Sequence, residues 1–207
     1  MPCMPSTKTP TKPPTTKSFR TAAAFEAWMQ KHHADADEIW LRVYKKHSGV
    51  ESVAITEALD VVLCWGWIDG IRKSFDEQSY LQRYTPRRAK SIWSQVNRDH
   101  VARLTKAGRM TPHGQKQIDA AKADGRWAAA YAPMRALDTE FPADLKAAIH
   151  RSPRAMKAFV SLSRQNRFAL AFRTNNMKTP DGRAKKIAAL VAIASERRDV
   201  LAAAFDA

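Results

Sequence analysis

The sequence has few cysteines and no metal-ligand pattern, and these absences exclude several classes of protein. Its 207 residues contain two cysteines, Cys3 and Cys64, so we expect no structural disulfide. Cys64 falls on the apolar face of a predicted helix, where a small buried hydrophobe is a commoner role than a nucleophile. The six histidines do not combine with cysteine at the spacings of zinc sites. We therefore expect neither a metal nor another cofactor.

Long apolar runs are also missing. No stretch approaches the roughly 20 apolar residues that a membrane-spanning helix needs. The first residues lack the apolar run of a signal peptide. We therefore expect a soluble cytoplasmic protein without a transmembrane segment.

Acidic residues are scarce relative to basic ones. The chain has 35 Lys and Arg against 20 Asp and Glu, which gives a formal net charge of +15. Residues 1–18 carry lysines but no acid, and their Thr, Pro and Lys content predicts a disordered basic tail. A field of this sign favours polyanions or acidic small molecules as partners. A surface that is cationic only for solubility is the alternative.

Hydrophobic periodicity predicts an α+β fold, with a small antiparallel sheet flanked by helices and a C-terminal all-helical unit. Strands are expected at residues 38–47, 67–74 and 79–85, the last two forming a hairpin. Helices are expected at residues 19–33, 55–63, 91–108, 112–125, 143–150, 153–162, 164–173 and 179–197. The predicted domains are the tail 1–18, an α+β domain 19–127, a linker 128–142 and a helical domain 143–207.

The first candidate site residue is Asp69, in the segment Gly66-Trp67-Ile68-Asp69-Gly70. On a strand, Asp69 shares a face with Trp67 and Ile71, so we expect a partly buried carboxylate that needs a partner. A four-residue loop pairs Asp69 with Tyr84, whereas a one-residue change in loop length brings Asp69 and Arg83 onto one face. Asp69 is either a scaffold residue that holds the hairpin or a general base or ligand-orienting group.

A second group of candidates follows the hairpin. Arg87, Arg88 and Lys90 precede a helix that we expect to begin at Ser91. The first turn of a helix has unpaired backbone N–H groups, so adjoining arginines favour an anion site. Ser91 either caps this helix or reaches a ligand, and Trp93 and Asn97 are expected on one helix face. The alternative is a capped helix with solvated arginines and a core tryptophan.

The same region also suits a polyanion. Residues 71–109 hold ten Lys and Arg against three Asp and Glu, interleaved with Tyr80, Tyr84 and Trp93. Such a surface tracks a nucleic-acid backbone while bases stack on the aromatic rings. No recognised nucleic-acid motif accompanies it, so nucleic acid is the second candidate partner.

These motifs resemble a known bacterial family, the YdeI/OmpD-associated or bacteriocin-protection proteins. The resemblance is strongest from Glu38 to Trp127. It rests on Ala58-Leu59-Asp60, Gly66-Trp67-Ile68-Asp69-Gly70, Thr85-Pro86-Arg87-Arg88, Ser91-Ile92-Trp93-Ser94, Asn97, Gly108-Arg109-Met110 and Gly125-Arg126-Trp127. Residues 142–146 and 180–187 are similar to the small helical domain of that family. The resemblance implies a role in resistance to bacteriocins or envelope stress, and it brings no catalytic residues.

The leading hypothesis is a cytoplasmic stress or bacteriocin-protection protein with a basic, tryptophan-lined pocket for an anionic small molecule. Its predicted ligand-binding residues are Trp67, Asp69, Arg83, Arg87, Arg88, Ser91, Trp93 and Asn97. In this hypothesis the tryptophans form walls, the arginines clamp the anion, and the remaining residues orient it. The alternatives are a nucleic-acid-binding module that uses residues 71–109 and, third, an enzyme with Asp69 as general base. We expect a binding protein rather than an enzyme, and the sequence names no protein partner.

Overall fold

The computed structural model describes residues 16–136 and 141–196 and divides into two compact units. The first unit comprises the chain up to Trp93 together with residues 97–129, and the second comprises residues 94–96 and the chain from Ala130 onward. The α+β fold with a helical C-terminal region is confirmed. In the described ranges, every helix is too short or too polar to cross a membrane.

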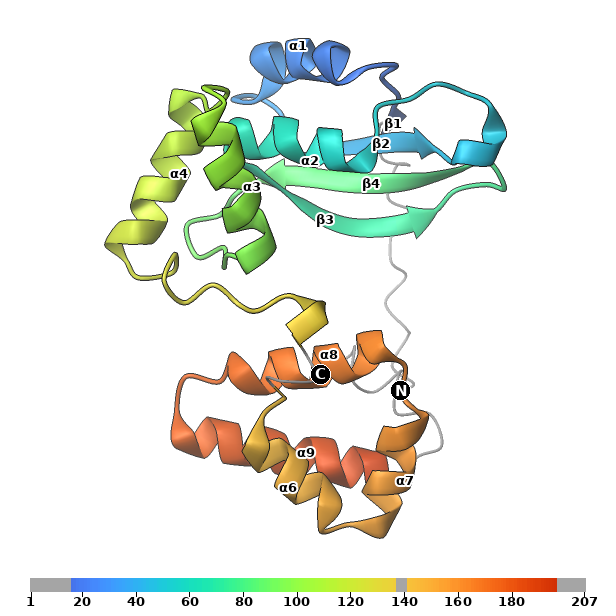
Figure 1. Ribbon diagram of the computed structural model, residues 1–207, viewed down its shortest axis with the longest axis vertical. Coiled ribbons are helices and arrows are strands. Elements are labelled where there is room, and N and C mark those ends of the chain that lie inside the picture. Colours follow the sequence, from blue (N-terminus) through green and yellow to red (C-terminus); the bar gives the residue numbers. More distant parts are fainter. Residues whose placement is uncertain (1–15, 137–140, 197–207) are drawn as a thin grey trace, which may run out of the picture. The chain divides into compact units, whose positions relative to one another are not determined.

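The first unit is built on a four-stranded mixed sheet (Figure 1). Its strands lie in the order β1-β2-β4-β3. Their bounds are β1 (Thr16–Lys17), β2 (Ile39–Tyr44), β3 (Trp67–Ser74) and β4 (Ser79–Pro86). The β3–β4 hairpin is antiparallel, as predicted, and β4 also pairs antiparallel with β2. Strand β3 is therefore an edge strand, which decides the exposure of its residues.

The predicted disordered tail requires a correction at its end. Residues 1–15, and Cys3 with them, lie outside the described residues. Thr16 and Lys17 form β1 and pair in parallel with Trp40 and Leu41 of β2. An exposed strand edge offers a row of backbone hydrogen-bonding groups. This pairing depends on backbone groups alone, so the polar composition of the tail did not reveal it.

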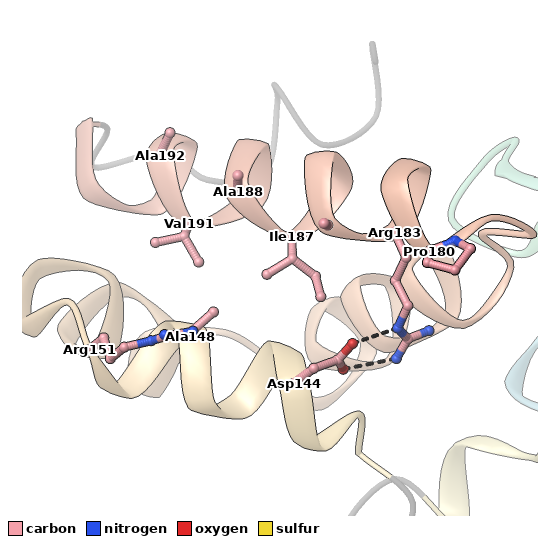
Figure 2. A pocket seen from close by; sticks show the side chains of 10 residues that line it. Asp144, Ala148, Arg151, Pro180, Arg183, Ile187, Ala188, Val191 and Ala192 are labelled. Carbon is pink, nitrogen blue, oxygen red and sulfur yellow. Dashed lines mark hydrogen bonds and ion pairs between the residues drawn. The ribbon is translucent and has the colours of Figure 1, made fainter.

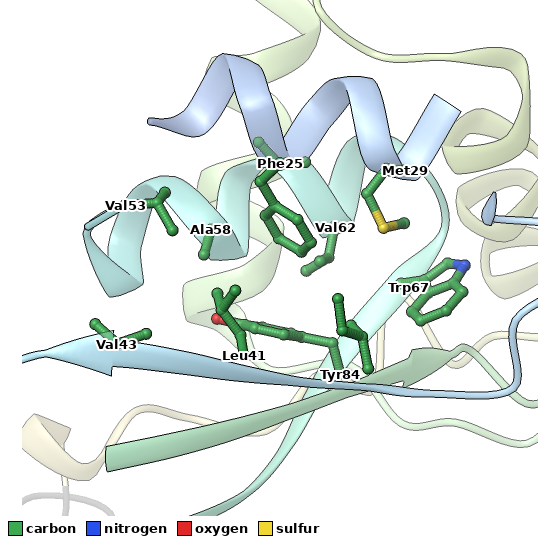
Figure 3. Packing of buried hydrophobic residues seen from close by; sticks show 11 residues of the cluster. Phe25, Met29, Leu41, Val43, Val53, Ala58, Val62, Trp67 and Tyr84 are labelled. Atoms are coloured by element: carbon green, nitrogen blue, oxygen red, sulfur yellow. The ribbon is translucent and has the colours of Figure 1, made fainter. Parts of the chain in front are cut away.

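Two helices, α1 (Ala22–His32) and α2 (Ile55–Cys64), cover one face of the sheet (Figure 3). Helix α1 begins at Thr21, whose side chain accepts a hydrogen bond from the backbone N–H of Ala24. Alternate residues of β2 face these helices. The buried cluster contains Phe25, Met29, Ile39, Leu41, Val43, Val53, Ala58, Val61, Val62, Trp67 and Tyr84. Full burial of each large member contributes about 1.5–3 kcal/mol, so this cluster is the main stabilising element of the unit.

Helix α4 (Pro112–Ala123) and the part of α3 (Gln95–Lys106) from Asn97 onward complete the first unit. The start of α4 approaches the end of α2 so closely that a β-carbon on Gly114 would lie 2.3 Å from the carbonyl oxygen of Cys64. Gly66, with a φ of +76°, follows α2 as a left-handed residue of the kind that often ends a helix. Glycine at both positions permits the close packing of α2 and α4.

The start of α3 differs from the prediction. The helix begins at Gln95 rather than Ser91. Residues 91–93 are irregular, and Ser94 forms an isolated bridge with Tyr131. Trp93 is buried before the helix starts, so it does not share a helix face with Asn97. The packing of Trp93 holds this segment out of the helix, which overrides the local helix signals.

The second unit is helical. It contains α6 (Ala143–His150), α7 (Pro153–Ser161), α8 (Arg164–Asn175) and α9 (Pro180–Glu196), close to the predicted ranges. Ser152, Ser163 and Thr179 precede three of these helices, and each side chain accepts a hydrogen bond from a backbone N–H of the first turn. The small core consists of Leu145, Ile149, Leu170 and Leu190, with partly buried residues around it.

Candidate functional site

Asp69 lies on the edge strand β3, next to a β-bulge. The pairing joins Asp69 to Tyr84, as the four-residue loop predicted, but the register shifts between Asp69 and Arg72. Residues 70 and 71 therefore share the position opposite Arg83, and Gly70 provides the flexible residue at which the strand bends. As a residue Asp69 is exposed, and Ile71 is 56% exposed. The edge position of β3 explains this exposure.

The environment of Asp69 perturbs its carboxyl group although the side chain reaches solvent. The surrounding protein raises the pKa of Asp69 by desolvation. The positive charges of Arg87 and Arg72 and a hydrogen bond from the side chain of Asn97 act in the opposite direction. Asp69, Asn97, Arg87 and Arg72 therefore form one interacting cluster.

Arg87 is the most unusual member of this cluster. Its side chain is almost completely buried, with the residue 7% exposed. The guanidinium carbon lies 3.5 Å from the centroid of the Trp93 ring, a close cation–π contact. One guanidinium nitrogen donates to the carbonyl oxygen of Ile92 at 3.3 Å, and the backbone N–H of Arg87 donates to that of Gly66 at 3.1 Å. The loop after β4 thus holds Arg87 against Trp93.

Trp93 forms the centre of a small aromatic group. It is 2% exposed, and its ring meets that of Trp127 edge to face at 4.8 Å between centroids. Arg98 lies over the other ring of this pair, 5.2 Å from the centroid of Trp127. Among the described residues, the indole N–H of Trp93 has no hydrogen-bond partner. Buried donors are normally paired, so an indole N–H without a partner is an unusual feature of this cluster.

The turn before Trp93 presents the exposed cations. Arg88 and Lys90 are exposed. The hydroxyl of Ser91 accepts a hydrogen bond from the backbone N–H of Arg88 at 3.2 Å, and the guanidinium of Arg126 donates to the Ser91 carbonyl at 2.8 Å. Ser91 therefore stabilises a turn and does not cap a helix. This change removes the helix N-terminus from the predicted anion site, since α3 begins four residues later.

Two predicted site residues lie elsewhere. Trp67 belongs to the buried cluster beneath α1, and its indole N–H donates to the carbonyl oxygen of His33 at 3.2 Å. Arg83 forms an ion pair with Glu38, with 2.6 Å between nitrogen and oxygen. Of the eight predicted residues, the structure brings Asp69, Arg87, Trp93 and Asn97 together.

Sequence reasoning missed Arg72 and Trp127 as neighbours of this cluster. The positive charge of Arg72 acts to lower the pKa of Asp69, and its guanidinium donates a hydrogen bond to the side-chain oxygen of Gln82 at 3.0 Å. Only the segment Gly125-Arg126-Trp127 carried a signal for Trp127, because it is one of the motifs of the resemblance. The periodicity of β3 carried none for Arg72, since the bulge changes which residues share a face.

A second charged cluster, also missed, lies between α2 and α3. Asp60 is 8% exposed and accepts hydrogen bonds from His100 at 2.7 Å and from Arg103 at 2.6 and 2.7 Å. Burial raises the pKa of Asp60, but the hydrogen bonds from Arg103 and His100 outweigh burial and leave that pKa below its usual value. The spacing of His100 and Arg103 places both on one face of α3. This cluster links two helices and has the character of a structural ion pair.

Comparison with known proteins gives two family matches on different parts of the chain. Residues 138–197 match the family described as bacteriocin-protection, YdeI or OmpD-associated. Residues 17–117 match a domain of unknown function, DUF8412. The family predicted from the sequence is thus confirmed for the C-terminal part. The sequence had placed the strongest resemblance between Glu38 and Trp127, and most of that range lies in the DUF8412 match instead. No curated protein and no solved structure matches the chain.

Proposed function

We propose that this protein has a bacteriocin-protection role in the bacterial cytoplasm and binds an anionic small molecule at the cluster around Arg87. The match of residues 138–197 supports the general role. One observation carries the ligand: the buried guanidinium of Arg87 lies over the ring of Trp93, whose indole N–H has no hydrogen-bond partner among the described residues. An N–H donor and a guanidinium together suit carboxylate or phosphate oxygens.

The charges around the cluster also favour an anion. The positive charges of Arg87 and Arg72 favour the ionised form of the single carboxylate of Asp69. The nearby turn adds two exposed cations, Arg88 and Lys90. Cations therefore outnumber the acid in this region. In this proposal Asp69 and Asn97 orient the ligand, and the exposed cations draw it toward the turn.

The test is thermal unfolding with phosphate, citrate and nucleotides at low and high salt. We expect at least one anion to stabilise the protein, because a ligand that binds the folded state raises the unfolding temperature. Trp93→Phe keeps an aromatic ring for Arg87 but removes the N–H, and it should abolish most of this stabilisation. Trp40→Phe is the matched control, since the Trp40 indole donates to Glu38 at 3.0 Å outside the cluster.

A second pair of variants tests the cations. Arg88→Ala changes an exposed residue of the turn, so the protein should fold normally and lose part of the anion response. Arg83→Ala removes a cation that is paired with Glu38 and should leave the response intact. If anions stabilise the wild-type and Trp93→Phe proteins equally, or stabilise neither at any salt concentration, the proposed site is wrong.

A second candidate function is nucleic-acid binding on the sheet face opposite α1 and α2. Lys73 lies over the Trp40 ring at 5.1 Å, and Arg42 lies over the rings of Tyr44 at 4.6 Å and Phe75 at 4.9 Å. Aromatic and cationic groups on one face suit stacked bases and phosphates. This candidate ranks second because Arg42 is already paired with an acid, Asp76, at 2.6 Å.

Fluorescence anisotropy with a short single-stranded oligonucleotide distinguishes the two functions. Nucleic-acid binding should weaken steeply between low and high salt and should be reduced by Lys73→Glu but not by Trp93→Phe. Absence of binding at low salt excludes this candidate, and an affinity independent of salt argues against a phosphate contact.

A further inference from the structure

The second unit contains an apolar groove between α6 and α9 that the sequence did not indicate (Figure 2). Its volume is about 750 Å³. The lining consists mainly of small and branched apolar side chains, Ala148, Ala184, Ile187, Ala188, Val191 and Ala192. An ion pair between Asp144 and Arg183 lies at one end of the groove, and Arg151 lies at the other (Figure 2).

The shape of the groove suits a helix. Ala184, Ala188 and Ala192 follow one another at intervals of four residues and form a stripe of small side chains along α9. All three are exposed, while Ile187 and Val191 beside them are half-buried. Small residues in such a row leave a channel that accepts the ridge of a neighbouring helix. The open alanines would not enclose a small molecule, which normally buries most of its surface in a pocket.

The length of the groove agrees with this interpretation. The lining on α9 runs from Pro180 to Ala192, which corresponds to roughly 18 Å of helix axis. That length accommodates about three turns of a second helix. A partner helix would place apolar residues at intervals of three and four positions along this span.

Charge indicates the composition of the partner. Residues 141–196 contain eleven Lys and Arg against three Asp and Glu. At one end, Asp144 accepts two hydrogen bonds from Arg183, whose guanidinium also donates to the carbonyl oxygen of Thr174 at 2.9 Å. Arg151 at the other end is exposed and forms no ion pair within the described ranges. A partner with acidic residues complements this unit, whereas a second copy would bring like charges together.

We propose that the groove between α6 and α9 binds the apolar face of an acidic amphipathic helix from another protein. The alanine stripe receives the apolar residues of that helix. Arg151 binds a carboxylate at its flank, and the Asp144–Arg183 pair fixes the spacing of the two groove helices. This interaction is separate from the anion site around Arg87, because every groove residue belongs to the second unit.

The probe is a synthetic, fluorescein-labelled helical peptide of about four turns, with leucines on one face and glutamates on the other. Binding to the full-length protein is measured by fluorescence anisotropy. One control peptide has lysine in place of each glutamate. The other has the same composition in an order that scatters the leucines around the helix. We expect the acidic amphipathic peptide to bind and both controls to bind at least about tenfold more weakly.

Two matched pairs of variants test the site itself. Ala188→Phe fills the groove and should weaken binding of the acidic peptide about tenfold or more, whereas Ala189→Phe, at an exposed neighbour outside the lining, should not. Arg151→Glu should weaken binding, whereas Arg154→Glu should have little effect, because Arg154 is also exposed but does not line the groove. These substitutions change exposed residues, so all four proteins should fold.

The outcomes separate the possible occupants. Selective binding of the acidic amphipathic peptide that Ala188→Phe abolishes supports the proposal. Equal binding of the lysine peptide would refute the proposal that the partner is acidic. If no peptide binds, the proposal that the groove takes up a helix is refuted. Self-association of the wild-type protein in sedimentation, removed by Ala188→Phe, would assign the groove to a second copy and overturn the proposal.

Discussion

The substitution Asp60→Asn tests whether the Asp60 cluster stabilises the first unit. It keeps the shape of the side chain but removes the negative charge of the carboxylate that accepts hydrogen bonds from His100 and Arg103 of α3. Asp60 lies on α2, so the variant weakens the connection between the two helices. Asn still offers one oxygen acceptor, and the loss is therefore smaller than the loss on removal of the whole side chain.

The expected magnitude follows from the exposure of each partner. A hydrogen bond to a charged group contributes roughly 1.5–3 kcal/mol, and Asp60 receives such bonds from two side chains. The side chain of Arg103 is 55% exposed, so water solvates it after the substitution and its contribution must be discounted. The side chain of His100 is 22% exposed and has less access to water. We expect Asp60→Asn to lower the free energy of unfolding by about 2 kcal/mol at pH 7.

The effect should depend on pH in one direction. The pKa of Asp60 lies below its usual value of 3.8 in the folded protein, so the folded state binds fewer protons than the unfolded state near that pH. The stabilisation is therefore complete above the unfolded pKa and disappears as the pH falls through the folded pKa. The wild-type protein should therefore still be the more stable of the two at pH 5, and the difference from Asp60→Asn should shrink below about pH 4.

Tryptophan fluorescence during urea unfolding is a suitable assay. All six tryptophans lie between Trp28 and Trp127 and belong to the first unit. The signal therefore reports the unit that contains Asp60. Asp119→Asn is the matched control, since Asp119 is exposed on α4 and accepts a hydrogen bond from Gln115; it should change stability by less than about 0.5 kcal/mol. An Asp60→Asn protein as stable as wild type at pH 7, or a difference undiminished at pH 3, would refute the reasoning.

Three further predictions concern other parts of the chain. Gly114→Ala should destabilise the first unit by several kcal/mol, measured by the same fluorescence assay, because its β-carbon would clash with the backbone of Cys64. Asp69→Asn should gain stability relative to wild type as the pH rises from 3 to 7. The raised pKa of Asp69 means that the folded wild-type protein loses stability as this carboxyl ionises, and equal pH profiles in urea unfolding would contradict this sign. Leu145→Ala removes a fully buried side chain of the second unit and should cost about 2–5 kcal/mol, with an earlier loss of helical circular dichroism and little change in the tryptophan transition.

The elements that periodicity predicted are those in which local signals and packing agree. The hairpin of β3 and β4 and the helices of the second unit lie close to their predicted ranges. The predicted start of the last helix at residue 179 agrees with α9, because the Thr179 cap and Pro180 at the first helical position act through the local backbone. The strand predicted at residues 38–47 contains β2, in which Ile39, Leu41 and Val43 alternate and pack under α1 and α2.

The candidate site was less predictable because it depends on contacts distant in sequence. The bulge between Asp69 and Arg72 decides which side chains of β3 share a face, and no residue pattern fixes a bulge position uniquely. Arg83 pairs with Glu38 across 45 positions. The late start of α3 reflects the packing of Trp93 against Trp127. Each of these outcomes is set by tertiary structure, so propensity and spacing could only name the participating residue types.

Ion pairing decides where the net positive charge of this protein can act on a ligand. Several arginines that contribute to it are already paired, including Arg42, Arg83 and Arg183 with Asp76, Glu38 and Asp144. A paired arginine presents a weak field to a passing anion, because its carboxylate partner cancels most of the charge at distances longer than the pair. The charge that remains for ligands therefore lies at residues such as Arg88 and Lys90 in the turn beside Trp93, and at Arg151 at the end of the groove. Binding that follows these exposed cations, and not the paired ones, is what distinguishes a specific site from the general attraction of a basic surface.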